Sequence, residues 1–82
     1  MRGTIALANG RRGRYAVLTE DGDYTLFELL ESVDLAVGEP VTGDFNAVAG
    51  ETYESERHGK LSVFAENYHC TLSFAERWVS GN

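Results

Sequence analysis

Cysteine, proline and long apolar runs are all scarce in this 82-residue sequence. The one cysteine, Cys70, excludes an internal disulfide and is typical of a reducing compartment, so we expect a cytoplasmic protein. No apolar run is long enough for a transmembrane helix, and none of the kind found in secretory signals follows the first basic residue, so we expect no membrane association. Because a domain this small has no disulfides to stabilise it, its stability must come from packing, which favours a compact closed sheet.

Basic residues are missing from the middle of the chain. Residues 20–56 contain eleven acidic residues and no lysine or arginine, whereas residues 1–19 contain four arginines and no acidic residue. The net charge of −6 argues against general affinity for nucleic acids, because that affinity comes from neutralising phosphates. The arginines near the start of the chain are still compatible with a small, local anion-binding site.

Alternating apolar residues and glycine-containing turns predict five strands in a single domain, residues 1–82. The predicted strands are residues 3–8, 14–19, 24–30, 41–45 and 60–66. Residues 46–59 are polar and charged, and we expect a long loop there, with a short hairpin as the alternative. Such a set of strands is typical of an all-β, five-stranded Greek-key barrel of the OB type. The residues predicted to form the core are Ile5, Leu7, Tyr15, Val17, Leu26, Val41, Val63 and Trp78.

The hydrophobic period changes near the end of the chain. Apolar residues at helical spacing predict a short C-terminal helix over about residues 71–79. Ser73 and Glu76 have the spacing of a capping box. We interpret Phe74 and Trp78 as covering one open end of the barrel. The alternative is an exposed aromatic patch that recognises another protein.

The first half of the chain resembles the cold-shock domains. Residues 1–5, Met-Arg-Gly-Thr-Ile, are similar to the opening of that family, and Asn9 stands where the family has an asparagine in its first-strand motif. Arg-Gly at positions 12–13 resembles the Lys-Gly that opens the first RNA-binding motif, and residues 35–41 resemble the entry to the fourth strand. The resemblance implies an OB-fold that binds single strands by stacking bases on exposed aromatic rings.

Most of the rings that such stacking needs are replaced in this sequence. Leu7 and Ala8 stand where the family has Trp and Phe, and Arg14 and Ala16 stand at two further ring positions. Phe27 is the ring that remains, and each lost stack costs about 1–3 kcal/mol of affinity. Binding of single-stranded RNA or DNA is therefore expected to be weak and driven by arginine. The residues predicted to carry it are Arg11, Arg12, Arg14 and Phe27.

Residues with catalytic or metal-binding chemistry form no recognisable pattern. His58, His69 and Cys70 carry metal-binding atoms, but zinc sites need four ligands, usually in paired short spacings. No nucleophile signature surrounds Cys70, and no phosphate-binding loop is present. We therefore predict a binding module that is not an enzyme and has no cofactor. Its partner is either a single-stranded nucleic acid or another protein, the latter implying an interaction or regulatory module that has lost nucleic-acid binding.

Overall fold

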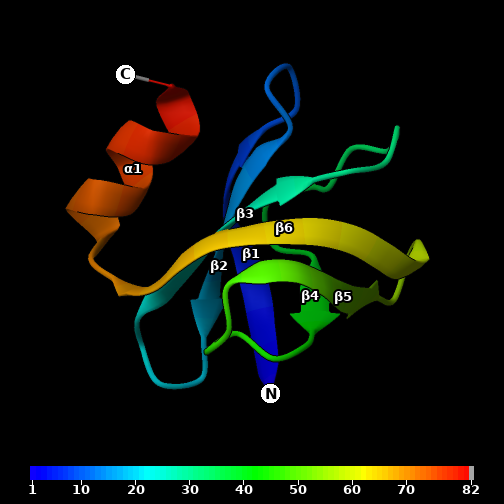
Figure 1. Cartoon of the computed structure of the whole chain (residues 1–82), viewed down its shortest axis with the longest axis horizontal. Helices are drawn as coiled ribbons and strands as arrows, with labels where there is room; N and C mark the ends of the chain where they lie inside the picture. Colours follow the sequence, from blue (N-terminus) through cyan, green and yellow to red (C-terminus); the bar gives the residue numbers. More distant parts are fainter. Residues whose placement is uncertain (82) are drawn as a thin grey trace.

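The computed structural model describes residues 1–81 and shows a closed antiparallel barrel with one helix against its outside (Figure 1). The strands are β1 (Arg2–Asn9), β2 (Arg14–Thr19), β3 (Tyr24–Leu29), β4 (Pro40–Thr42), β5 (Ala49–Ser55) and β6 (Gly59–Cys70), and the helix is α1 (Leu72–Ser80). Their order around the barrel is β1-β2-β3-β6-β5-β4, and β4 pairs with β1 to close it. The predicted all-β barrel with a C-terminal helix is confirmed, with six strands in place of five. Within residues 1–81, no helix is long and apolar enough to span a membrane.

The additional strand is β5, which lies in the segment that we expected to be a loop. Its inward positions, Tyr53 and Ser55, are buried, while Gly50, Thr52 and Glu54 face outward. β5 pairs with β6 along its whole length, from Ala49 to Ser55. Only one of the inward side chains is apolar, so the hydrophobic alternation that identifies a strand is too weak to detect.

A bulge in β1 separates two side chains that the alternation had placed on one face. Ile5 pairs with Val17 and lies in the barrel interior, whereas Leu7 pairs with Ala16 and lies outside. A bulge adds one residue to a strand and so exchanges the inward and outward faces beyond it. Six of the eight predicted core residues are buried, and Leu7 and Trp78 are partly buried.

Aromatic rings fill the barrel interior. Tyr15 and Phe27 stack with their ring centroids 5.6 Å apart. Tyr53 packs edge-on against Phe27 at 5.1 Å and against Phe45 at 5.0 Å. Gly43 is required beside these rings, because a Cβ at that position would lie 2.5 Å from the Tyr53 ring. The interior is therefore a packed core of rings contributed by four different segments.

The helix α1 covers the outer face of β1, β2 and β3 (Figure 1). Ala75 and Val79 on α1 pack against Ala16 and Leu26, and this cluster is separate from the core inside the barrel. Phe74 is 42% exposed. The expectation that the helix covers an end of the barrel was wrong, because its apolar face meets side chains that point outward from the sheet.

The caps of α1 define where it begins and ends. The hydroxyl of Thr71 accepts a hydrogen bond from the N–H of Phe74 at 3.2 Å, so Thr71 is the N-cap. The capping box expected at Ser73 was wrong, because Ser73 already lies within the helix. Gly81 ends the helix in a left-handed conformation with φ of 87°, which glycine adopts without strain.

The packing of α1 predicts different effects for two of its apolar residues. We expect Val79→Ala to lower the free energy of unfolding by about 1–2 kcal/mol, because two buried methyl groups are lost. Phe74→Ala removes more atoms but from an exposed ring, so its effect is expected to be smaller. Urea denaturation of both variants measures the difference. A Phe74 variant that is the less stable of the two would show that the packing face of α1 is assigned incorrectly.

Candidate functional site

The turn between β1 and β2 brings predicted binding residues to the C-terminal end of α1. Arg14 Nη1 donates a hydrogen bond to the carbonyl oxygen of Trp78 at 2.9 Å, and its guanidinium carbon lies 4.8 Å from the centroid of the Trp78 ring. Asn9 Nδ2 donates to the carbonyl oxygen of Val79 at 2.8 Å. The last carbonyls of a helix have no partner within it and carry a partial negative charge. Arg14 and Asn9 therefore stabilise the end of α1.

Arg11 and Arg12 are exposed at the tip of the same turn, which we call the basic tip. Arg12 runs beside the end of α1, since a Cβ on Gly81 would lie 2.6 Å from Arg12 Nε. Among residues 1–81, no carboxylate lies within 4.0 Å of either guanidinium group. The basic tip is thus a small positive surface on an otherwise acidic molecule.

Phe27, the fourth residue predicted to bind nucleic acid, lies inside the barrel. Its ring is fully buried between Tyr15 and Tyr53. A ring without exposed surface cannot stack on a base, so the role predicted for Phe27 was wrong. On the outside of β3, Leu26 lies beneath α1 and Glu28 is exposed.

The face to which the cold-shock resemblance assigns base stacking is the face that α1 covers. Leu7 and Ala16, which occupy two of the ring positions, both lie in the cluster beneath the helix. The neighbouring outward residue on β3 is Leu26. At these three positions displacing α1 would therefore uncover aliphatic side chains, and Tyr24 at the edge of the same cluster is a ring on the sheet side of it.

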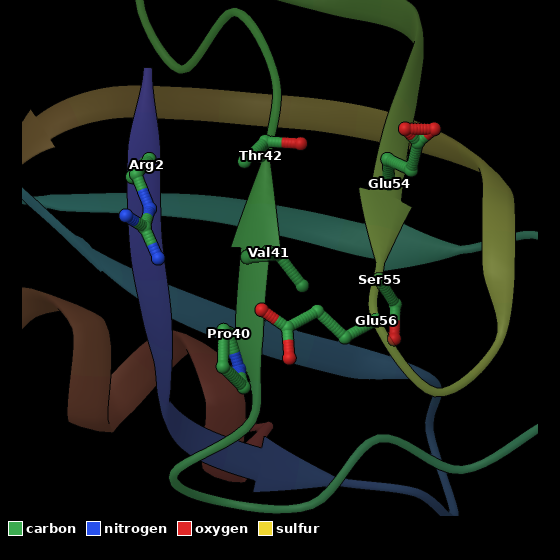
Figure 2. Close-up of a pocket in the computed structure, with 7 residues that line it drawn as sticks. All are labelled: Arg2, Pro40, Val41, Thr42, Glu54, Ser55 and Glu56. Carbon is green, nitrogen blue, oxygen red and sulfur yellow. The ribbon is translucent and has the colours of Figure 1, made fainter.

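A groove with a volume of about 210 Å³ lies outside the barrel between β1, β4 and β5 (Figure 2). Its floor includes Val41 and Ser55, which are buried. Figure 2 shows Arg2 on one side of the groove and Glu54 on the opposite side, with Glu56 reaching over the floor. Opposite charges on two sides of the groove suit a small zwitterion. A specific ligand site also needs buried polar groups to orient the molecule, and among the lining side chains only Ser55 is both buried and polar.

The Ser55 hydroxyl is already used by a buried cluster behind this groove. It donates to a carboxylate oxygen of Glu39 and accepts hydrogen bonds from the N–H groups of Arg57 at 3.1 Å and His58 at 3.2 Å. The Glu39 carboxylate also accepts from the N–H of Ala36 at 3.2 Å and lies 4.0 Å from His58 Nε2. The cluster therefore connects the turn before β4 to the turn between β5 and β6.

The environment of Glu39 favours its charged form. Burial raises the pKa of the Glu39 carboxyl, but the hydrogen bonds from Ser55 and Ala36 and the nearby His58 and Arg57 lower it. The lowering effects are larger in sum, so the pKa lies below its ordinary value of 4.5.

The other residues with metal-binding atoms, His69 and Cys70, form no set of metal ligands. Cys70 is buried and its Sγ donates to the carbonyl oxygen of Tyr68 at 3.6 Å, while His69 is exposed with its Nε2 3.8 Å from Asp23 Oδ2. Burial, together with the charge of Asp23, raises the pKa of the Cys70 thiol. Within residues 1–81, no three His, Cys, Asp or Glu side chains are placed to hold a metal ion.

Sequence reasoning missed an apolar surface on the outside of β3, β6 and β5. We call it the β5–β6 face and define it by five residues: Leu30, Gly50, Thr52, Ser62 and Phe64. Leu30 is 58% exposed and Phe64 is 42% exposed. The N–H of Leu30 donates to the carbonyl oxygen of Ser62 at 3.0 Å, and Phe64 pairs in register with Gly50. Leu30, Gly50, Thr52 and Ser62 line a shallow hollow on this face.

A signal for half of this surface was present in the sequence. With Leu61, Val63 and Ala65 facing inward, Phe64 must face outward. The other half is formed by β5, the strand that the sequence did not reveal.

Comparisons of the chain with protein-family models, with curated proteins and with solved structures found no match.

The buried Glu39 carboxylate predicts how stability depends on pH. Because folding lowers its pKa, its ionised form stabilises the folded state above pH 4.5, and this contribution is lost as the pH falls through the pKa of the folded protein. At pH 7 we expect Glu39→Gln to lower the free energy of unfolding by about 1–3 kcal/mol. The difference from the wild type should shrink below pH 4.5.

Urea denaturation between pH 7 and pH 3 measures this difference. Glu54→Gln, at an exposed position on β5, serves as the control and should follow the wild type at neutral pH. A destabilisation by Glu39→Gln that stays constant over this pH range would contradict the assigned role.

Proposed function

We propose that this protein is a small, non-enzymatic binding module that recognises another protein through its β5–β6 face. The observation that carries the proposal is the exposure of Leu30 and Phe64 around a hollow on a sheet face that α1 does not cover. Exposed apolar groups surrounded by polar residues mark protein interaction sites, and aromatic residues are frequent anchors in them.

We further propose that the scaffold is an OB-type barrel whose ligand has changed from nucleic acid to protein. The meander β1-β2-β3, the pairing of β4 with β1 and the pairing of β6 with β3 are compatible with a closed barrel of that type. On such a scaffold, the position of α1 over β1, β2 and β3 would replace the bases that cold-shock domains hold there. Recognition would then move to the opposite part of the sheet.

Weak binding of single-stranded RNA or DNA is a second candidate function. The observation that favours it is the exposed basic tip, where Arg11 and Arg12 have no carboxylate from residues 1–81 within 4.0 Å. Phosphate contacts alone would carry such binding, since no ring lies in the tip. The net charge of −6 opposes it.

The first experiment separates these two candidates. Fluorescence anisotropy of a labelled pyrimidine-rich oligonucleotide is expected to detect no saturable binding even at ~20 mM salt, where screening is weak. Saturable binding with a slope of about −0.7 in log affinity against log salt for each phosphate contact would favour the nucleic-acid function. In that case Arg11→Ala and Arg12→Ala should each reduce the slope by about one contact.

The second experiment tests the protein-binding function itself. In affinity purification from its native cells, the wild-type chain is expected to retain a protein in stoichiometric amount, and a Leu30→Ser, Phe64→Ser double variant is expected to lose it. Phe74→Ser is the matched control, because Phe74 and Phe64 are both 42% exposed. Retention of the same partner by the double variant, or failure of the wild type to retain any partner, would reject the function.

A further inference from the structure

Acidic side chains lie next to both apolar residues of the β5–β6 face. Glu28 on β3 pairs in register with Phe64 on β6. The carboxylate of Glu31, the residue after Leu30, accepts a hydrogen bond from the N–H of Ser62, which lines the hollow. Side chains at paired positions of neighbouring strands lie about 4.5–5.5 Å apart, so Glu28 is within direct reach of whatever covers Phe64.

These acids restrict what can cover the apolar centre. Binding over Leu30 and Phe64 would remove water from Glu28 and Glu31, and a carboxylate buried without a charged partner is costly. A surface that brings lysine or arginine to these positions compensates the cost and is also attracted from a distance. A neutral or acidic partner would be rejected by the same carboxylates.

We infer that the β5–β6 face binds a basic segment of a partner protein in which one apolar side chain is flanked by lysine or arginine. This inference rests on the proposed protein-binding function and adds the chemistry of the partner. The apolar side chain occupies the hollow between Leu30 and Phe64, above Gly50. At Gly50 an added Cβ would meet no atom within 4 Å, so the surface is open there. The flanking basic groups pair with Glu28 and Glu31.

Two other occupants fit these observations less well. A second copy placed face to face would bring Glu28 and Glu31 against the same acids. The basic tip of a second copy would supply charge, but its residues, Asn-Gly-Arg-Arg-Gly at positions 9–13, include no large apolar side chain. Nucleic acid would place phosphates against carboxylates, which repel them.

The inference is tested by NMR titration of the ¹⁵N-labelled full chain with synthetic peptides of defined charge. The probe is acetylated and amidated Lys-Lys-Phe-Lys-Lys at ~20 mM salt, where electrostatic attraction is weakly screened. We expect saturable changes in the amide signals of the five residues that define the β5–β6 face. Replacing the central Phe of the probe by Ser should weaken binding about tenfold, and Glu-Glu-Phe-Glu-Glu should not bind.

Variants of the protein separate the apolar and charged contributions. Phe64→Ser is expected to weaken binding of the Phe probe about tenfold, and the Glu28→Gln, Glu31→Gln double variant should flatten its dependence on salt. The matched controls on α1, Phe74→Ser and Glu76→Gln, are at exposed positions and should leave affinity unchanged. A dispersed amide spectrum for each variant shows that it is folded.

Three results would overturn the inference. The first is signal changes that cluster on α1 or on the basic tip. The second is equal affinity for the Phe and Ser probes, which would mean that charge alone drives binding. The third concerns the partner from native cells: if its retention depends on Phe64 but not on Glu28 and Glu31, the protein-binding function stands and the basic character of the partner is rejected. Retention that does not depend on Phe64 rejects the function as well.

Discussion

The barrel closes through β4, a strand of three residues that pairs with β1 on one side and with β5 on the other. Glu39, immediately before β4, connects both neighbours, because its carbonyl oxygen accepts from the N–H of Ile5 at 2.9 Å and its carboxylate binds the Ser55 hydroxyl. Without this short connection the sheet would have two unpaired edges, which are sites of aggregation. The ring-filled interior and the outer surfaces therefore depend on a buried charged group next to the shortest strand.

The parts of the fold that follow from local sequence were predictable, and those that depend on distant contacts were not. The meander β1-β2-β3 follows from alternation and from the Asp-Gly turn at position 21–22. The bulge in β1 moves the Leu7 side chain to the outside of the barrel, where α1 covers it. Its position therefore depends on a helix at the other end of the chain. Phe27 was assigned to a binding surface because of its place in a motif, although its neighbour Leu26 was the residue that faces outward. When two adjacent residues of a strand are both apolar, the sequence does not show which of the two side chains faces the barrel interior.

The arginines show how a charge cluster on the sequence divides into different roles in three dimensions. Arg14 is occupied by the carbonyl oxygen and ring of Trp78, so its charge is directed at the end of α1. Arg11 and Arg12 remain exposed. The sequence identified the cluster but gave no sign of its partner, since the helix end that Arg14 stabilises lies 64 residues away along the chain. The basic turn and the helix are therefore parts of one structural unit on the covered side of the barrel.

Covering one side of a small barrel determines where else it can bind. The interior is filled by rings, and the outer face of β1, β2 and β3 lies under α1. The outside of β3, β6 and β5 and the groove between β1, β4 and β5 are left for recognition by a larger partner. An exposed apolar pair on a strand face invites association between copies, and natural sheets oppose this with charge. In the proposed mode, Glu28 and Glu31 fulfil this role, because two copies would bring like charges together. The same carboxylates attract a basic partner. The carboxylates that keep copies apart would thus also select the partner, and one set of charges would serve both solubility and specificity.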